Sequence, residues 1–256
     1  MDQESLGGGE VIKSWCKPWW NGLLDLLIPP HCAICGRLLD DGGATKICPS
    51  CMTKIQYLSL PQCFICGREL HGPANSIHRC ATCLRQPPPY VRVASIIRYA
   101  PPVTELLFRL KYHGDTTVVP AIAELVAGYD FSPFRESDLI LPVPLFRRRL
   151  QARGLNQSLV LARIFFPGLS DKIDPRLLRR LRWTAAQTGL TGAARRRNLR
   201  GAFGLDDPQR IAGKTVTLVD DVFTTGTTIA ECSRTLLQAG CREVRVVTFA
   251  RVLPPD

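Results

Sequence analysis

Eight of the eleven cysteines form four CxxC pairs, and their spacing constrains the fold more than any other feature of the sequence. The pairs occur as two successive copies of one pattern, in which a longer spacer separates one CxxC pair from the next. Four thiolates presented in this way supply the closed tetrahedral coordination of structural zinc. The repeat therefore predicts a double zinc ribbon over residues 31–86 that holds two zinc ions, with ligands Cys32, Cys35, Cys48, Cys51, Cys63, Cys66, Cys80 and Cys83.

The spacing leaves the pairing of the CxxC units open. One zinc ion per copy is the simpler assignment, although alternate pairs could also share a metal in a cross-braced arrangement. Disulfide bonds are disfavoured because thiols stay reduced in the cytoplasm, where we expect this protein. Histidines beside the pairs could replace a cysteine but are more often bystanders, and these are His31, His71 and His78. The cysteines outside the repeat are expected to be ordinary buried or idle thiols, and these are Cys16, Cys232 and Cys241.

The segment QPPPY at residues 86–90 predicts a linker after the cysteine repeat. Beyond it the pattern changes to alternating strands and helices, which is typical of a parallel sheet in an α/β domain over residues 90–256. Strands are expected at residues 91–99, 139–142, 216–219 and 244–249, and helices at 102–112, 116–129, 156–166 and 228–239. Residues 1–30 are expected to form a separate helical segment.

The start of the chain and its hydropathy argue for a cytoplasmic protein. No apolar run approaches the ~20 residues that a membrane span needs. Residues 1–10 are acidic and glycine-rich, and polar residues interrupt the apolar stretch that follows, so a secretory signal is not expected. Residues 15–28 are amphipathic and include Trp19 and Trp20, which could touch a membrane surface, although packing on the ribbon or the sheet is the favoured interpretation.

The net charge of +11 indicates an anionic partner. One cluster follows the strand at 139–142 and consists of Arg147, Arg148, Arg149 and Arg153. A second lies between residues 175 and 205, where there is no acidic residue, and consists of Arg176, Arg179, Arg180, Arg182, Arg195, Arg196, Arg197 and Arg200. We expect both clusters to lie in loops that flank one sheet, which favours anion binding over a merely solvated surface. The connection at 174–212 is so long that it is expected to be functional or disordered.

The stretch VTLVDDVFTTGTTIAE at residues 216–231 predicts a ligand site. Asp220 and Asp221 end a buried strand, and ligands of open α/β sheets bind beyond the carboxyl ends of the strands. Residues 224–227 then lie at the start of a helix, where backbone N–H groups can hold a phosphate and Gly226 permits close approach. Carboxylates can accept hydrogen bonds from hydroxyl groups, and here they lie beside a turn that can hold a phosphate. This combination fits a sugar phosphate.

This stretch resembles the phosphoribosyl pyrophosphate (PRPP) binding motif of type I phosphoribosyltransferases. Together with LKYHGD at 110–115, LPVPLFRRRLQARGLNQS at 141–158, RWTAAQTGLTGAARRRNLRGAF at 182–203 and the double zinc ribbon, it resembles the ComF family over residues 29–251. The resemblance implies an α/β fold, the Rossmann-like parallel sheet of type I phosphoribosyltransferases, with a small N-terminal zinc-ribbon domain.

The resemblance also implies roles for individual residues. Asp220 and Asp221 would be the catalytic pair that engages the ribose 2- and 3-hydroxyls, and residues 182–201 would be the flexible loop that closes the site. The 5-phosphate would be held by Thr224, Thr225, Gly226, Thr227 and Thr228, and the pyrophosphate would be approached by Arg147, Arg148 and Arg149. Mg²⁺ would bridge the pyrophosphate and the ribose with few protein ligands. The activity implied is transfer of a pentosyl group from PRPP to an acceptor that the sequence does not identify.

Two other functions compete with this one. A nucleotide triphosphatase is disfavoured because the GKT at 213–215 has Pro208 in place of the first P-loop glycine and precedes its strand. ComF proteins are associated with natural competence and the uptake of transforming single-stranded DNA, which implies single-stranded DNA and proteins of the uptake machinery as partners. The alternative is therefore a non-catalytic DNA-binding competence factor that uses the PRPP site as a sensor. Aromatic stacking platforms for DNA are not obvious in the sequence, since Trp183 alone lies in the basic segment.

Overall fold

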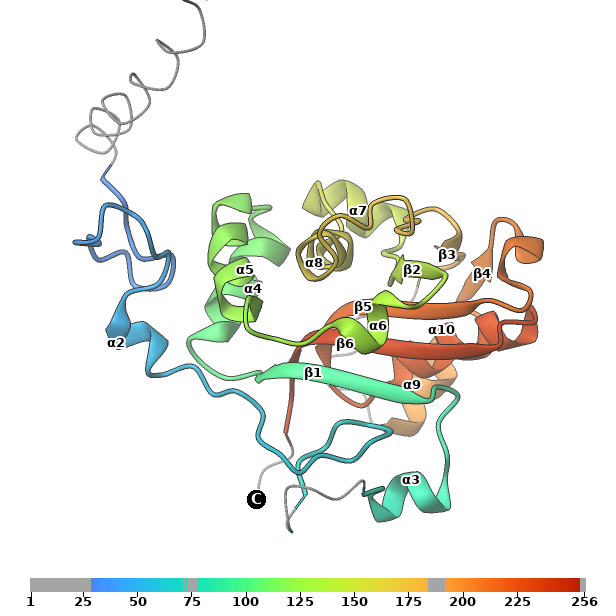
Figure 1. The fold of residues 1–256 in the computed structure, drawn as a ribbon. Coiled ribbons are helices and arrows are strands. Elements are labelled where there is room, and N and C mark those ends of the chain that lie inside the picture. Colours follow the sequence, from blue (N-terminus) through green and yellow to red (C-terminus); the bar gives the residue numbers. More distant parts are fainter. Residues whose placement is uncertain (1–28, 71, 73–77, 184–191, 254–256) are drawn as a thin grey trace, which may run out of the picture.

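A computed structural model describes residues 29–70, 72, 78–183 and 192–253 (Figure 1). The helical segment expected over residues 1–30 falls almost wholly outside these ranges, as do Cys16, His71 and the tryptophans at 19 and 20. Among the described residues, none of the helices has the length and apolar character needed to cross a lipid bilayer.

The centre of the fold is a parallel sheet of four strands in the order β1-β6-β5-β2. The strands are β1 (Arg92–Arg98), β2 (Leu139–Pro142), β5 (Thr215–Phe223) and β6 (Glu243–Arg251). The central strands β5 and β6 are buried over most of their length, as expected when both faces of a parallel sheet are covered. The predicted parallel sheet is confirmed, and β5 extends past Val219 so that the two aspartates are part of the strand.

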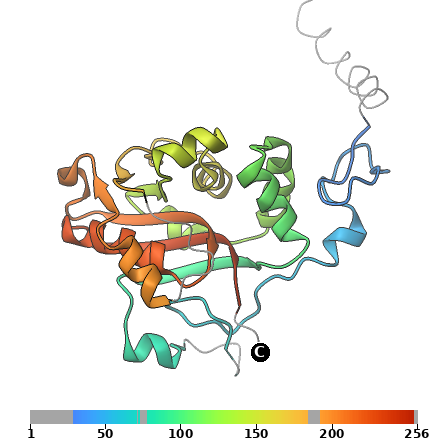
Figure 2. The ribbon, with the colours of Figure 1, turned by 180° about the vertical axis from the view of Figure 1, so that it is seen from behind.

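Helices cover both faces of the sheet. Helices α4 (Val103–Tyr112), α5 (Val119–Val126) and α8 (Gln157–Phe165) share one core with β1, and α10 (Thr227–Gln238) packs in a second core on the other face (Figures 1 and 2). Shorter helices are α2 (Pro49–Met52), α3 (Ala81–Arg85), η1 (Thr116–Val118), α6 (Ser132–Arg135), α7 (Arg147–Arg153), α9 (Gly192–Leu199) and η2 (Pro208–Ile211).

The long basic connection is largely ordered within the described residues, which corrects the expectation of a loop. Strands β3 (Leu178–Arg180) and β4 (Phe203–Leu205) pair antiparallel, with Arg180 opposite Phe203. Apolar side chains of this connection, including Leu178, Leu199 and Phe203, are buried in the same core as α10. These side chains pack the connection against the domain. In the sequence, the many arginines around them obscure the apolar pattern by which strands and helices are recognised.

The two ribbons pack on the α/β domain. In the first, Cys32, Ile47 and Ile55 join the core of α4 and α5, and Lys46 N donates to Glu124 Oε2 at 2.6 Å. Residues 56–58, which connect the ribbons, run along the edge strand β1, where Leu58 N donates to Ile96 O at 3.1 Å. This contact covers backbone groups that an edge strand otherwise leaves unpaired.

Candidate functional site

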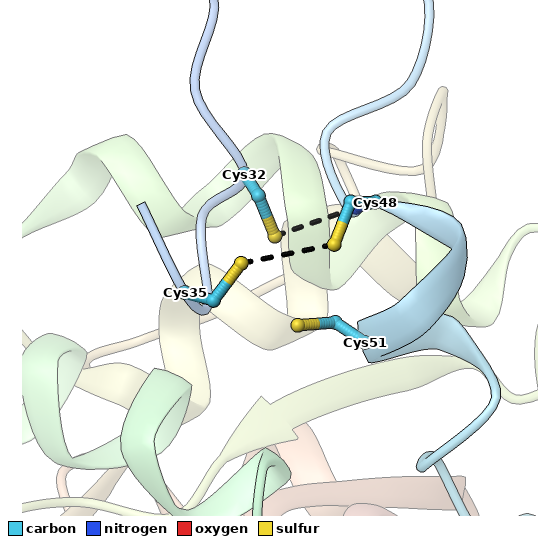
Figure 3. A group of neighbouring side chains, drawn as sticks. All are labelled: Cys32, Cys35, Cys48 and Cys51. Atoms are coloured by element: carbon cyan, nitrogen blue, oxygen red, sulfur yellow. Dashed lines mark hydrogen bonds between the residues drawn. The ribbon is translucent and has the colours of Figure 1, made fainter. Parts of the chain in front are cut away.

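The eight repeat cysteines form two clusters, each made by one copy of the repeat. Cys32, Cys35, Cys48 and Cys51 face one centre (Figure 3), and the second cluster is made by Cys63, Cys66, Cys80 and Cys83. The Sγ atoms of Cys35 and Cys48 are 3.7 Å apart, and those of Cys66 and Cys80 are 3.8 Å apart. Tetrahedral zinc with Zn–S bonds of about 2.3 Å requires sulfurs about 3.8 Å apart. Both clusters therefore fit structural zinc, and the tandem pairing is the one that the fold adopts.

Backbone donors support the thiolates. The backbone N–H of Cys48 donates to Cys32 Sγ at 3.3 Å, and that of Cys80 donates to Cys63 Sγ at 3.2 Å. The Ser50 hydroxyl, 3.2 Å from Cys48 Sγ, lowers the pKa of that thiol to about 6. Neither His31 nor His78 contributes a ligand atom to the clusters. The ligand sets are thus all-cysteine, and these donors favour the thiolate form of Cys32, Cys48 and Cys63.

The acidic pair lies where β5 meets two helices. Ser158, at the start of α8, donates its hydroxyl to Asp220 Oδ1 at 3.0 Å. Lys111, near the end of α4, places Nζ 2.7 Å from Asp221 Oδ2, and both side chains are less than a fifth exposed. The two aspartates therefore have different partners, a neutral hydroxyl for Asp220 and an ammonium for Asp221.

The pKa of the Asp220 carboxyl lies well above its usual value. Burial, followed by the repulsion of Asp221, raises the pKa of Asp220 to about 7. Burial lowers the pKa of Lys111, but the attraction of Asp221 outweighs it and the pKa of the ammonium lies above its usual value. Near neutral pH the Asp220 carboxyl therefore titrates, next to the ion pair between Lys111 and Asp221.

The pair opens into a cleft of about 520 Å³. Thr224 and Thr228 line it beside the aspartates, and its cationic lining residues are Lys111, Arg149, Arg153 and Arg180. The cations outnumber the carboxylates, which suits a ligand that carries phosphate groups as well as hydroxyls. Of the first arginine cluster, the cleft includes Arg149 and Arg153.

Arg147 and Arg148 are exposed and do not line the cleft. The sequence placed the first arginine cluster in a loop, whereas residues 147–153 form helix α7. Successive residues of a helix point in different directions, so three adjacent arginines cannot share one cleft. Arg147 and Arg148 thus lie outside the cleft lining, and their approach to a pyrophosphate stays a prediction.

The threonine-rich turn separates the cleft from a second cavity of about 420 Å³. Gly226, with φ of 71°, precedes α10, and the hydroxyls of Thr225 and Thr227 are 2.8 Å apart. Thr225, Gly226 and Thr227 line the second cavity with residues of the second ribbon, while Thr224 lines both spaces. The five residues expected around a phosphate thus form the turn itself, and they are divided between the two spaces on either side of it.

Comparison with known proteins identifies the family. A family model described as a double zinc ribbon domain matches residues 23–86, and one described as a phosphoribosyl transferase domain matches residues 162–253. The DNA utilization protein YhgH of Escherichia coli K12 is 34% identical over 235 residues, which cover 89% of this chain and 100% of that relative. The chain belongs to the ComF family.

Two relatives are named for competence. Competence protein F of Haemophilus influenzae is 33% identical over 211 residues, covering 80% of the present ComF chain and 90% of that relative. Competence protein ComFC of Bacillus subtilis is 26% identical over 199 residues, covering 76% and 79%. The ComF assignment, the phosphoribosyltransferase-like fold and the competence association expected from the sequence are thereby confirmed.

The cleft of this ComF protein is also lined by residues for which the sequence predicts no individual role, namely Lys111, Tyr112, Gln157 and Ser158. They belong to the stretches LKYHGD and LNQS, which contribute to the family resemblance as a whole. Their positions carry a signal, because each lies near a helix end that faces the carboxyl edge of the sheet. Contacts between side chains so far apart in the chain require the folded structure.

Proposed function

We propose that this ComF protein binds PRPP with Mg²⁺ in the 520 Å³ cleft and transfers its ribosyl group to an acceptor, within the DNA-related role of its family. The observation that carries the proposal is the acidic pair at the end of β5, which faces four cationic side chains beside the start of α10. Asp220 and Asp221 would accept hydrogen bonds from ribose hydroxyls, and the turn at 224–228 would hold the 5-phosphate.

In the transfer, the bond between the anomeric carbon and pyrophosphate breaks, and its electron pair leaves with the pyrophosphate. A lone pair of the acceptor forms the new bond to that carbon, and the acceptor loses a proton. Arg149, Arg153 and Arg180 line the cleft and would stabilise the charge on the departing pyrophosphate. Magnesium, when bound with PRPP, would neutralise part of the same charge.

Asp221→Asn tests the site. The substitution removes a charge-assisted acceptor, so we expect PRPP binding in the presence of MgCl₂ to weaken by about 1–3 kcal/mol, measured by calorimetric titration. Asp206→Asn is the matched control, because Asp206 is also ion-paired, to Arg179 at 2.6 Å, but lies exposed outside the cleft. Equal PRPP affinity in Asp221→Asn and wild type would remove this assignment.

The affinity for PRPP should depend on pH through Asp220. Its raised pKa of about 7 means that the carboxyl is protonated below that value and ionised above it. Because the ionised form accepts hydroxyl hydrogen bonds more strongly, binding should tighten as pH rises from about 6 to 8. The phosphates of PRPP also titrate near pH 6. Asp220→Asn isolates the protein's contribution, and a pH profile that stays the same in this variant would contradict the prediction.

A second function is binding of single-stranded DNA without turnover, with the PRPP site as a sensor. The names of the relatives, one for DNA utilization and two for competence, favour a DNA role, as does the net charge of +11. Release of pyrophosphate from PRPP separates the two functions. The transferase releases it when an acceptor is supplied, whereas the sensor binds PRPP and releases none with any base or strand.

A further inference from the structure

Arg251 lies between the second ribbon and the threonine-rich turn. It ends β6, where it is the register partner of Phe223 at the end of β5. Its Nη1 donates to the backbone oxygen of Cys66, a member of the second cysteine cluster, and its guanidinium lies 4.6 Å from the ring centre of Phe223. The side chain of Arg251 also lines the second cavity, whose lining comes from both the ribbon and the turn.

The charge of Arg251 is buried without a carboxylate partner. The residue is 5% exposed, and within the described residues no carboxylate forms an ion pair with it. Its Nε has no hydrogen-bond partner in the same part of the chain. A buried cation is costly unless a negative charge compensates it. A zinc ion bound by four thiolates is a net dianion, so the loaded second cluster supplies that compensation.

Phe223 extends the contact from Arg251 to the turn. The ring of Phe223 is 4% exposed, and Tyr90 packs edge-on against it with ring centres 6.5 Å apart. The turn lies directly on this ring, because a Cβ added to Gly226 would be 2.6 Å from its Cζ. Close packing of this kind transmits a displacement, so a shift of the guanidinium moves the ring and the turn with it.

We propose that Arg251 is a positioning residue that couples the second zinc centre to the turn at 224–228. The loaded cluster compensates the guanidinium, the guanidinium fixes the ring of Phe223, and the ring supports Gly226. Loss of the metal leaves a buried cation uncompensated, and the turn then loses its support. The consequence for PRPP rests on the proposed function, in which this turn holds the 5-phosphate.

Hydrogen exchange at the Ala230 amide reports the turn without any ligand, because this amide donates to the backbone oxygen of Gly226 at 2.8 Å. In the full-length chain, we expect Arg251→Met to accelerate this exchange about 5- to 30-fold, the effect of losing a desolvated cation–π contact. Arg251→Lys keeps the charge and should retain most of the protection. Cys83→Ser, which removes a ligand of the second zinc, should accelerate exchange by a similar factor.

The double variant Cys83→Ser/Arg251→Met distinguishes coupling from two independent defects. Without the zinc-loaded cluster, Arg251 is an uncompensated buried cation, and methionine removes the cost of burying it. The double variant should therefore exchange no faster at Ala230 than Cys83→Ser alone, whereas independent defects would multiply. Exchange at the Val143 amide, which donates to Val219 O at 2.9 Å, verifies that the sheet stays folded in each variant.

Two matched controls separate the coupling from general destabilisation. Arg92 also contacts an aromatic ring of the second ribbon, Phe64 at 5.3 Å, but does not line the second cavity. Cys32→Ser removes a ligand of the first zinc, whose cluster packs in the core of α4 and α5, whereas Phe223 belongs to the core of α10. Arg92→Met and Cys32→Ser should both leave exchange at Ala230 unchanged.

Unchanged exchange at Ala230 in both Arg251→Met and Cys83→Ser would overturn the coupling. Multiplied effects in the double variant, or equal acceleration in Cys32→Ser, would do the same. Calorimetry with PRPP distinguishes this failure from that of the proposed function. PRPP binding by wild type with unchanged exchange in the variants removes the coupling alone. The expected exchange without PRPP binding removes the proposed function and leaves the coupling in place. Where both hold, the affinity for PRPP falls in Arg251→Met by the same factor as the protection of Ala230.

Discussion

Replacing Cys32 with serine is expected to remove about one zinc ion per chain and to unfold the first ribbon, because structural zinc contributes about 10–16 kcal/mol in isolated zinc fingers. Cys32 is buried, and its ligand atom lies within 4.8 Å of those of its three partners. With three thiolates left, the tetrahedral site is incomplete, and the loops of the ribbon lose the metal that links them. Elemental analysis measures the zinc, and hydrogen exchange at residues 30–56 reports the ribbon.

Cys241→Ser is the control for this experiment. Cys241 is also buried but lies outside both clusters, and its Sγ donates to the backbone oxygen of Lys214 at 3.1 Å. A serine hydroxyl can make the same hydrogen bond, so the zinc content should stay at its wild-type value. Full zinc content in Cys32→Ser would show that this cysteine is not a ligand.

Gly226→Ala is expected to lower the free energy of unfolding by about 2–5 kcal/mol, from left-handed backbone strain together with overpacking. Gly226 has a φ of 71°, and a Cβ added there would lie 2.6 Å from Cζ of Phe223. Because the ring of Phe223 is buried in the core of α10, it has little room to move. Urea denaturation measures the loss, and PRPP binding should weaken with it because the turn at 224–228 shifts.

Gly128→Ala separates this effect from the general cost of replacing a glycine. A Cβ at Gly128 meets nothing within 4 Å, and no left-handed φ is required there. Its stability should change little or increase slightly, since alanine restricts the unfolded chain. Equal stabilities of the two alanine variants would mean that the turn is not constrained as described.

The features that the sequence predicted well are contiguous in the chain. A CxxC pair closes its own knuckle, as in the hydrogen bond from Gly36 N to Cys32 O at 2.9 Å. Likewise Asp220, Asp221 and the turn before α10 follow one another directly, so the order of residues sets strand, turn and helix together. Local geometry of this kind depends little on the rest of the fold.

The predictions that failed concern the two basic segments. Helix α7 has no buried residue, so the apolar periodicity by which a helix is recognised was absent. In the connection at 174–212, Leu178 and Phe203 lie among arginines and pair only because β3 and β4 meet. Short elements of this kind are stabilised by tertiary packing, and propensity alone does not reveal them.

The sequence by itself determined which thiolates are available for zinc, and where a carboxylate pair ends a buried strand ahead of a phosphate-type turn. The tertiary structure alone decided the partners of those groups: which CxxC pairs share a cluster, that Lys111 meets Asp221, and that Trp183 and Tyr112 flank one cleft. The reason is physical. Contacts between distant segments form only when the helices pack on both faces of the sheet. The free energy that stabilises these contacts comes from burial of the whole core.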